Sequence, residues 1–230
     1  MVFHGFQKMT LLDYPGKVAC TLFTAGCNFR CPFCHNSSLV LAPGGTEQYT
    51  EEEVLSYLKK RKGLLEGVAV TGGEPTLDPG LPDFLRRVKG LGFPVKLDTN
   101  GTDPTLLAAL VSEGLVDYAA MDIKNCKEKY AASAGVPALD MAPILESVSY
   151  LLSGAVDYEF RTTLVRKLHT VDDIAAAAEW IAGARRYFLQ NFVDSGMLID
   201  SAMTGVPKEE TLRMLDAARR FVPSAAVRGL

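Results

Sequence analysis

The chain has 230 residues, which suits one large domain or two small ones, and its 48% hydrophobic content is ample for a buried core. A net charge of −3 gives no basic signature for nucleic acid, and no uninterrupted apolar run reaches the roughly 18 residues that a membrane span needs. The five cysteines are odd in number and three are crowded together, which argues against an extracellular disulfide framework. We therefore expect a cytoplasmic protein that binds neither nucleic acid nor membranes.

Apolar, β-branched runs alternate with helical stretches, and six of these runs are candidate strands. They cover residues 18–24, 67–71, 94–99, 118–123, 158–165 and 186–192. The helices between them have recognisable starts, such as the capping-box pair Thr50 and Glu53 and the N-cap and proline pairs that begin at Asp78 and Asp103. A last amphipathic helix is expected at about 207–222, and the absence of a linker indicates a single domain over residues 1–230.

Strands that alternate with helices pair in parallel through right-handed crossovers. A doubly wound sheet and a barrel both fit this pattern. Polar segments end almost every strand (TGGE, LDTNG, MDIKN, FRTT and LQN), and barrel enzymes build their active sites at that rim. Because six units are fewer than the eight of a closed barrel, we expect an α/β fold with a partial (β/α)6 barrel of parallel strands, open on one side.

The loop at residues 26–36 carries Cys27, Cys31 and Cys34 in the spacing C-x3-C-x2-C. Thiolates select soft metals, mainly zinc, copper(I) or iron–sulfur clusters. A structural zinc ion would need a fourth ligand, for which Cys126 is the serious candidate, and this zinc-stabilised binding module is one alternative. In a cluster of four irons, three thiolates would instead leave one iron open, unlike ferredoxins, which supply four cysteines.

The pattern C-x3-C-x-aromatic-C, in which Phe33 is the aromatic residue, resembles the signature of the radical S-adenosylmethionine (radical SAM) enzymes. The segment TGGEP at 71–75 resembles the family's GGE motif, whose backbone and glutamate receive the SAM amino group. The resemblance implies one [4Fe-4S] cluster whose open iron is chelated by SAM, with Phe33 beside the adenine. It also implies that the reduced cluster cleaves SAM to a 5′-deoxyadenosyl radical, which abstracts a hydrogen atom.

The residues themselves agree with this resemblance. Gly72 and Gly73 at a strand end let a backbone approach a ligand closely, and Glu74 offers a carboxylate to an ammonium group. Asp122 and Lys124 should face the same side of their strand. A buried lysine needs a counter-charge, which the SAM carboxylate or, alternatively, an internal Asp–Lys ion pair would provide.

Several features resemble one subgroup of this family, the activases that install a glycyl radical on a partner protein. They are the His35-Asn36 pair after the third cysteine, the D-x-K pattern of Asp122 to Lys124, and the compact length. In that subgroup the D-x-K residues and the third-strand aspartate, here Asp98, lie near the methionyl end of SAM, in some members around a monovalent cation.

The segment LLDYPGK resembles the lead-in of activators of the anaerobic ribonucleoside-triphosphate reductase. Its residues Asp13, Pro15, Gly16 and Lys17 are candidates for the rim that meets the partner's loop, or they form a turn before a strand. Our candidates for catalysis and metal binding are Cys27, Cys31 and Cys34, with Asp13 and Lys124 as further catalytic residues. Our candidates for cofactor binding are Phe33, Gly72, Gly73, Glu74, Asp98, Asn100, Asp122, Lys124, Arg161 and Gln190.

The partner expected from this resemblance is a glycyl radical enzyme, with anaerobic ribonucleotide reductase as the first choice. Residues 35–70 contain no cysteine, whereas some activases carry a ferredoxin-like insert there. A single-cluster oxidoreductase needs an external electron donor such as flavodoxin or ferredoxin. The alternative within the family is an enzyme that acts on a small molecule, such as a 7-carboxy-7-deazaguanine synthase-like enzyme.

Overall fold

The computed structural model describes residues 1–194, 196 and 198–229 of the chain, which forms two compact units. The first unit contains residues 1–28, 38–120 and 155–157, and the second contains residues 29–37, 121–154 and 158 onward. The single domain expected over residues 1–230 stays a prediction, and residues 195, 197 and 230 of that range lie outside the described residues.

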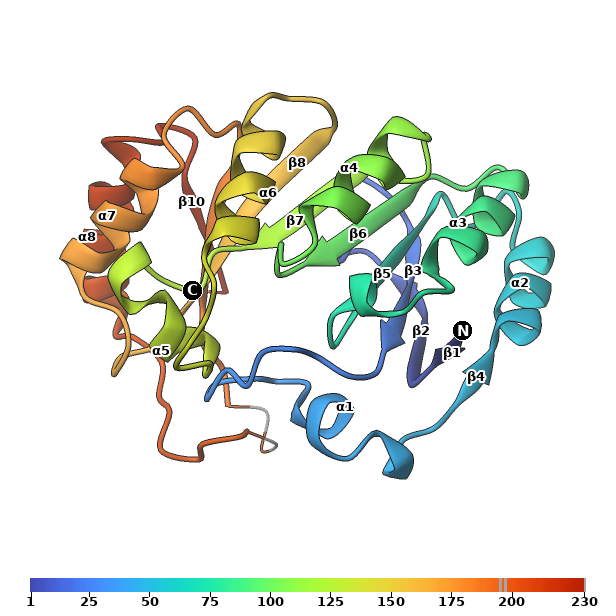
Figure 1. Ribbon diagram of the computed structural model, residues 1–230, viewed down its shortest axis with the longest axis horizontal. Helices are drawn as coiled ribbons and strands as arrows, with labels where there is room; N and C mark the ends of the chain where they lie inside the picture. The colour runs from blue at the N-terminus through green and yellow to red at the C-terminus, as the bar shows by residue number, and fades with distance from the viewer. Residues whose placement is uncertain (195, 197, 230) are drawn as a thin grey trace. The chain divides into compact units, whose positions relative to one another are not determined.

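The helices and strands alternate along the chain (Figure 1). The strands are β1 (Val2–Phe3), β2 (Gly5–Thr10), β3 (Ala19–Thr24), β4 (Tyr49–Thr50), β5 (Gly67–Gly72), β6 (Val95–Thr99), β7 (Tyr118–Asp122), β8 (Asp157–Leu164), β9 (Tyr187–Asn191) and β10 (Ala226–Arg228). The α-helices are α1 (Ser37–Leu41), α2 (Glu51–Lys60), α3 (Leu81–Gly90), α4 (Pro104–Ser112), α5 (Tyr130–Ala134), α6 (Ala142–Leu152), α7 (Val171–Trp180) and α8 (Lys208–Arg219). Short 3₁₀ turns are η1 (Pro43–Gly45), η2 (Pro75–Leu77) and η3 (Lys127–Lys129).

The α/β fold with an open, partial (β/α)6 barrel is confirmed. The six expected strands are β3, β5, β6, β7, β8 and β9, each within one residue of its expected ends. In the first unit β3 pairs in parallel with β5 and β5 with β6, and in the second β8 pairs in parallel with β9. In the described part of the chain, β2 pairs only with β3 and β10 only with β9, so the strands do not close into a ring.

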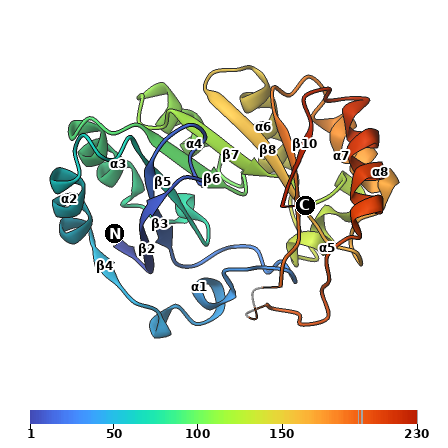
Figure 2. The same cartoon turned by 180° about the vertical axis from the view of Figure 1, so that it is seen from behind.

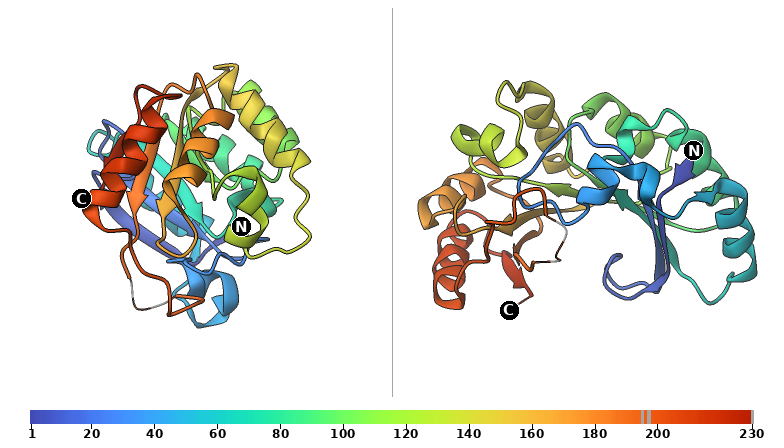
Figure 3. Two further views of the ribbon diagram at one scale, coloured as in Figure 1. Left: turned by 90° about the vertical axis from the view of Figure 1, so that its left-hand side faces the viewer. Right: turned by 90° about the horizontal axis from the view of Figure 1, so that it is seen from below.

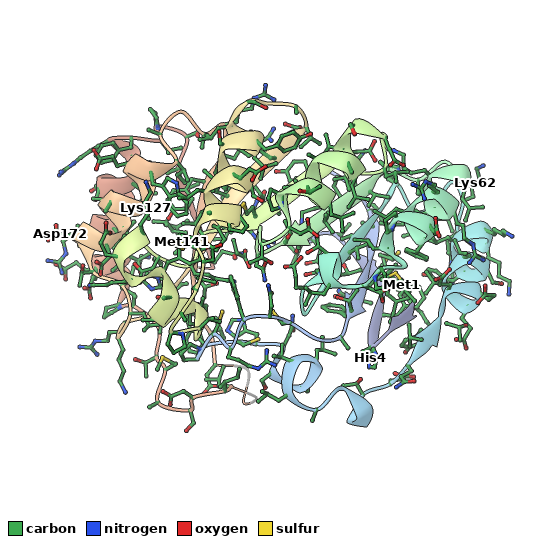
Figure 4. The ribbon with its side chains drawn as sticks, viewed as in Figure 1. Met1, His4, Lys62, Lys127, Met141 and Asp172 are labelled. Atoms are coloured by element: carbon green, nitrogen blue, oxygen red, sulfur yellow. The ribbon has the colours of Figure 1, made fainter. Side chains whose placement is uncertain are left out.

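Four strands were not expected from the sequence. β2 adds to the first unit antiparallel to β3, and β10 adds to the second parallel to β9. β1 and β4 form a separate antiparallel ribbon, which Met1 and His4 flank in Figure 4. The Met1 ammonium pairs with Glu51 of α2, and His4 Nδ1 lies 2.8 Å from Thr46 Oγ1.

The two faces of the first unit's sheet differ in character. Leu22, Val70 and Leu97 share one face and are fully buried, and α3 contacts β6 through its own buried apolar residues. Their strand neighbours on the other, inner face are small or polar, as in the row Thr21, Ala69 and Lys96. In the second unit α7 and α8 lie side by side (Figure 3). None of the described helices is long and apolar enough to cross a membrane.

Local capping explains where several helices begin. Thr50 and Glu53 form the expected capping box of α2, and Asp103 Oδ1 accepts from the Leu106 N–H at 2.9 Å at the start of α4. The expectation at Asp78 is wrong, because the 3₁₀ turn η2 ends there. Asp78 Oδ1 instead accepts from the N–H of Gly80, which is the N-cap residue of α3.

An ion pair with a buried carboxylate holds the last strand in the second unit. Both terminal nitrogens of Arg228 donate to the Glu159 carboxylate, at 2.8 and 2.9 Å, and the Glu159 side chain is 1% exposed. The guanidinium carbon of Arg228 also lies 3.4 Å from the centroid of the Phe188 ring. β10 is therefore held by charge and stacking as well as by its ladder with β9.

We predict that Arg228→Ala lowers the free energy of unfolding by about 2–4 kcal/mol, because a buried carboxylate loses its bidentate donor. Chemical denaturation measures this value. Arg220→Ala, which removes an exposed arginine after α8, is the matched control and should change the free energy by about 0.5 kcal/mol or less. Equal effects of the two substitutions would contradict the prediction.

Candidate functional site

The GGE segment after β5 packs directly on the backbone that leaves β3. The Gly73 N–H donates to the Thr24 carbonyl at 2.9 Å, and the Glu74 N–H donates to the Gly26 carbonyl at 2.8 Å. A Cβ on Gly73 would lie 1.8 Å from the Gly26 oxygen, and one on Gly72, whose φ is +118°, would lie 2.4 Å from the Thr24 backbone. The two glycines are thus required by contact between two segments of backbone, a reason that the sequence analysis did not foresee.

The Glu74 carboxylate is buried and ties the carboxyl ends of β5 and β6 together. Oε1 accepts from the Thr76 N–H and hydroxyl at 3.2 and 2.7 Å and from the Thr99 hydroxyl at 2.8 Å, and Oε2 accepts from the Asn100 N–H at 2.7 Å. Burial raises the pKa of Glu74, and these donors oppose the rise. A carboxylate can accept about four hydrogen bonds. Donors of the protein therefore occupy the positions on Glu74 that were expected from the sequence to bind the SAM amino group.

Asn100 connects this segment to the first cysteine. Its Nδ2 donates to Asn28 Oδ1 at 2.7 Å and lies 4.0 Å from Cys27 Sγ. Its Oδ1 accepts from the Thr102 N–H and hydroxyl at 3.0 and 2.7 Å. Asn28 Nδ2 in turn is 2.8 Å from Thr102 Oγ1. Cys27 therefore lies beside a closed ring of amide and hydroxyl groups, anchored to Glu74 through Asn100.

Asp98 has a protein cation beside it. Lys96 lies on the same face of β6 and donates to the Asp98 carboxylate, and the two side chains are 2% and 14% exposed. The sequence analysis missed Lys96. The sequence does contain a pattern that could have found it: Lys96 lies between the apolar, buried residues Val95 and Leu97, so its side chain points to the opposite, inner face.

The second half of the cysteine loop belongs to the second unit and packs on the end of α5. The Arg30 N–H donates to the Ala134 carbonyl at 2.8 Å. Gly135, with φ +67°, permits this contact, because a Cβ there would lie 2.1 Å from the Arg30 oxygen. Beyond this anchor Cys31 is buried, Cys34 is half-buried, and the Cys34 N–H donates to the Cys31 carbonyl at 3.0 Å.

Positive charge lies near the sulfurs of this half-loop. Burial raises the pKa of the Cys34 thiol, and the charges of Lys124 and Arg30 oppose the rise. Burial lowers the pKa of Lys124, but Asp122 and then Cys31 raise it above its usual value. Phe33, between the two cysteines, is 4% exposed and packed within the unit.

Asp122 holds two cations. It accepts from Lys124 Nζ at 2.9 Å and from Arg161 Nε at 3.0 Å. Burial would raise the pKa of Asp122, but Arg161 and Lys124 outweigh it and hold the pKa below its usual range. The internal Asp–Lys ion pair, which the sequence left open as an alternative, is therefore present, and Lys124 has a counter-charge within the protein.

Three consecutive backbone carbonyls, beginning at the last residue of β7, each face a side-chain donor. The pairs are Tyr130 Oη with the Asp122 oxygen at 3.0 Å, Thr162 Oγ1 with the Ile123 oxygen at 2.7 Å, and His169 Nε2 with the Lys124 oxygen at 2.9 Å. His169 Nδ1 accepts from the Val165 N–H at 3.0 Å, so the proton is on Nε2. His169 was not among the sequence candidates, because a single histidine far along the chain carries no local signal.

Two further residues of the second unit are Gln190 of β9 and His35 of the cysteine loop. Gln190 is half-buried and stands in register with Thr163 of β8 and Arg228 of β10. The His35 ring packs on the Phe192 ring, with centroids 5.2 Å apart, and burial lowers the pKa of His35.

The LLDYPGK segment lies at the opposite end of the first unit's sheet from Cys27. The connection from β2 enters the amino end of β3, whereas the cysteine loop leaves its carboxyl end (Figure 2). The six residues of β3 separate these ends by about 20 Å. The expected placement at the catalytic rim is therefore wrong for Asp13, Pro15, Gly16 and Lys17.

Asp13 and its neighbour Tyr14 instead make contacts within the first unit. Asp13 Oδ2 accepts from the Thr21 hydroxyl at 2.6 Å. The Tyr14 ring packs in a buried cluster with Tyr118, Ala19 and Ala120, and a Cβ on Gly67 would lie 2.8 Å from it. Tyr14 thereby covers the amino end of the inner face.

The fit of a metal group depends on the chemistry of the cysteines. In the described residues, no three His, Cys, Asp or Glu side chains are arranged as a ready metal site, and Cys126 Sγ lies 3.7 Å from Asp173 Oδ1. The zinc-stabilised module with Cys126 as fourth ligand stays a prediction. Cys27 lies in one unit, and Cys31 and Cys34 lie in the other. Their fit to a metal group rests on three thiols that form no disulfide, two of which lie near cations.

Comparisons with known proteins agree on one family. Residues 21–181 match the family model described as the radical SAM superfamily. A Methanocaldococcus jannaschii protein, provisionally named a glycyl-radical enzyme activating enzyme, is 30% identical over 97% of this chain and 94% of its own length. A radical SAM methyltransferase from Sphaerobacter thermophilus has the same fold, with a TM-score of 0.74 at 15% identity over 96% of this chain and 68% of its own.

Two relatives match over shorter stretches. The pyruvate formate-lyase-activating enzyme of Clostridium pasteurianum is 37% identical over 103 residues, which are 43% of this chain and 42% of that protein. The anaerobic ribonucleoside-triphosphate reductase-activating protein of Escherichia coli is 29% identical over 92 residues, which are 39% of this chain and 58% of that protein.

We predict that Gly73→Ala lowers the free energy of unfolding by about 3 kcal/mol, because the new Cβ meets backbone that no side-chain movement can relieve. Urea denaturation measures the change. Gly45→Ala places its Cβ in open space and should change the free energy by about 0.5 kcal/mol or less. A Gly73→Ala variant as stable as Gly45→Ala would show that the close contact is not maintained.

His169 should make stability depend on pH. Burial lowers its pKa in the folded state, so its contribution is full above the unfolded pKa of about 6.5 and is lost as pH falls through the folded value. We expect the free energy of unfolding to fall between pH 7.5 and 5.5 by more in the wild type than in His169→Gln, whose amide can still donate to Lys124. An equal fall in both proteins would assign the dependence to other groups.

Proposed function

Because the chain belongs to the radical SAM superfamily, we propose that it activates a glycyl radical enzyme by removing a hydrogen atom from a glycine of that partner. The observation that carries the proposal is the 30% identity to the Methanocaldococcus jannaschii relative, which extends over nearly the full length of both chains. The small-molecule alternative is not favoured, because the relatives described above are named as activating enzymes.

Anaerobic ribonucleoside-triphosphate reductase is the first partner to test. The similarity to the Escherichia coli activating protein supports this choice. The similarity to a pyruvate formate-lyase-activating enzyme makes pyruvate formate-lyase the natural comparison partner. A glycine Cα–H is not shielded by a side chain, and the radical formed there is delocalised by the flanking amides, so one chemistry would serve either partner.

The cysteine loop would hold the cofactor. Cys27, Cys31 and Cys34 are thiols outside any disulfide that suit three irons of a [4Fe-4S] cluster. Burial raises the pKa of the Cys34 thiol, and the charges of Lys124 and Arg30 oppose that rise. When bound, the cluster and SAM supply a 5′-deoxyadenosyl radical that accepts the glycine hydrogen. The protein supplies orientation and exclusion of water, because such a radical attacks nearby C–H bonds without selectivity.

Each candidate side chain has a proposed part in that orientation. The backbone of Gly72 and Gly73 would meet the SAM amino group. The Glu74 carboxylate would hold this backbone in place by accepting hydrogen bonds from the N–H groups of Thr76 and Asn100. Lys124 and Arg161, already held by Asp122, would present positive charge to the SAM carboxylate. Asn100 would position Cys27, and Phe33 and Gln190 would line the adenosyl end.

An external donor such as flavodoxin or ferredoxin would provide the electron, since residues 35–70 carry no cysteine for a further cluster. A monovalent cation is the remaining component that the resemblance implies near Asp98. Whether it is needed depends on the protein cations that already stand beside Asp98 and Asp122.

The test is anaerobic reconstitution with iron and sulfide, followed by electron paramagnetic resonance with SAM, a reductant and each purified partner. We expect a glycyl doublet on the partner and one 5′-deoxyadenosine per radical formed. Cys27→Ser, Cys31→Ser and Cys34→Ser should each lose the cluster, whereas Cys20→Ser and Cys126→Ser should keep the wild-type iron content.

Two results would overturn the proposal. One is 5′-deoxyadenosine formation that no glycyl radical enzyme accelerates and that instead accompanies conversion of a metabolite. The other is loss of iron in Cys126→Ser to the same extent as in Cys31→Ser, which would make Cys126 a ligand.

A further inference from the structure

A buried lysine in the first unit has no part in the proposed function. Lys96 of β6 stands opposite Ala69 of β5, and Ala69 stands opposite Thr21 of β3. These small neighbours leave room for a lysine on the inner face, where its side chain is 2% exposed. Burying an ammonium group is costly unless an opposite charge compensates it.

Strand geometry places the compensating charge. Side chains two residues apart on a strand share a face, so Asp98 stands beside Lys96, and the ammonium donates to its carboxylate. The intervening residue Leu97, like Val95, is fully buried on the opposite face. Both charged side chains therefore share the inner face, which brings them beside one another.

We propose that the Lys96 ammonium is the permanent counter-ion of Asp98 and stands in place of the monovalent metal cation that the family resemblance implies at this carboxylate. A metal ion that approached Asp98 would meet a like charge at contact distance in a poorly solvated place, where repulsion is strong. It would also have to displace a tethered ammonium of high effective concentration. The inference rests on the proposed function only in taking SAM as the nearby ligand.

The first experiment uses the wild-type protein. Its melting temperature and its rate of 5′-deoxyadenosine formation from SAM are measured in sodium, potassium and choline chloride at equal ionic strength. We expect the same melting temperature and rate in all three salts. A melting temperature or rate that is lower in choline than in sodium or potassium would overturn the proposal.

The second experiment removes the ammonium. Lys96→Met keeps the length of the side chain without its charge, so Asp98 should then take up a metal ion. We expect its melting temperature in sodium or potassium to exceed that in choline by about 4 °C, as for an ion present at ten times its dissociation constant. A Lys96→Met protein that is indifferent to the salt would overturn the proposal.

The matched control is Lys89→Met. Lys89 also pairs with an aspartate of the first unit, Asp117 at 2.6 Å, but their side chains are 28% and 37% exposed. Its removal should create no difference between the salts. If Lys96→Met cannot be purified, Lys96→Gln replaces it. The comparison of the three salts in the wild-type protein still tests the proposal by itself. The melting temperatures do not depend on any partner protein, so absence of a glycyl radical would refute the proposed function and leave this result standing.

Discussion

The buried carboxylate of Glu74 is the interaction on which the carboxyl end of the first unit depends. It accepts hydrogen bonds from η2 on one side and from the end of β6 on the other, and these donors compensate its removal from water. Asn100, held by its N–H to Glu74, extends its side chain to Asn28 and Cys27. The position of the first cysteine therefore follows from a glutamate nearly fifty residues further along the chain.

The second unit also compensates a carboxylate, but with positively charged side chains instead of N–H and hydroxyl donors. Asp122 is compensated by Lys124 and Arg161, and the carbonyls of the loop that follows are bound by side chains from α5, β8 and the start of α7. In both units the charged residues expected to serve a ligand already have protein partners. Such a site is organised before any ligand arrives, which reduces the entropy that binding must overcome.

The sequence predicted the repeating architecture because its signals are local. Apolar runs and polar strand ends located the six central strands, and capping residues located the starts of α2 and α4. The direction of β2 has no such signal, since its exposed segment GFQKMT lacks alternation. Asp13 lies at the far end of β3 from Cys27 because Asp13 precedes this strand and Cys27 follows it. Lys96 and His169 were missed because their importance arises from partners met only across strands and loops.

The hydrogen bonds of Glu74 fix the carboxyl end of the first unit before any cofactor binds. Amide hydrogen exchange of Asn100 in the cofactor-free protein tests this most directly, because its N–H donates to Glu74 Oε2 at 2.7 Å. The account predicts exchange as slow as that of Val70 in the middle of β5. Exchange at the rate of an open loop would contradict it, since the segment would then acquire its order only from the cofactor.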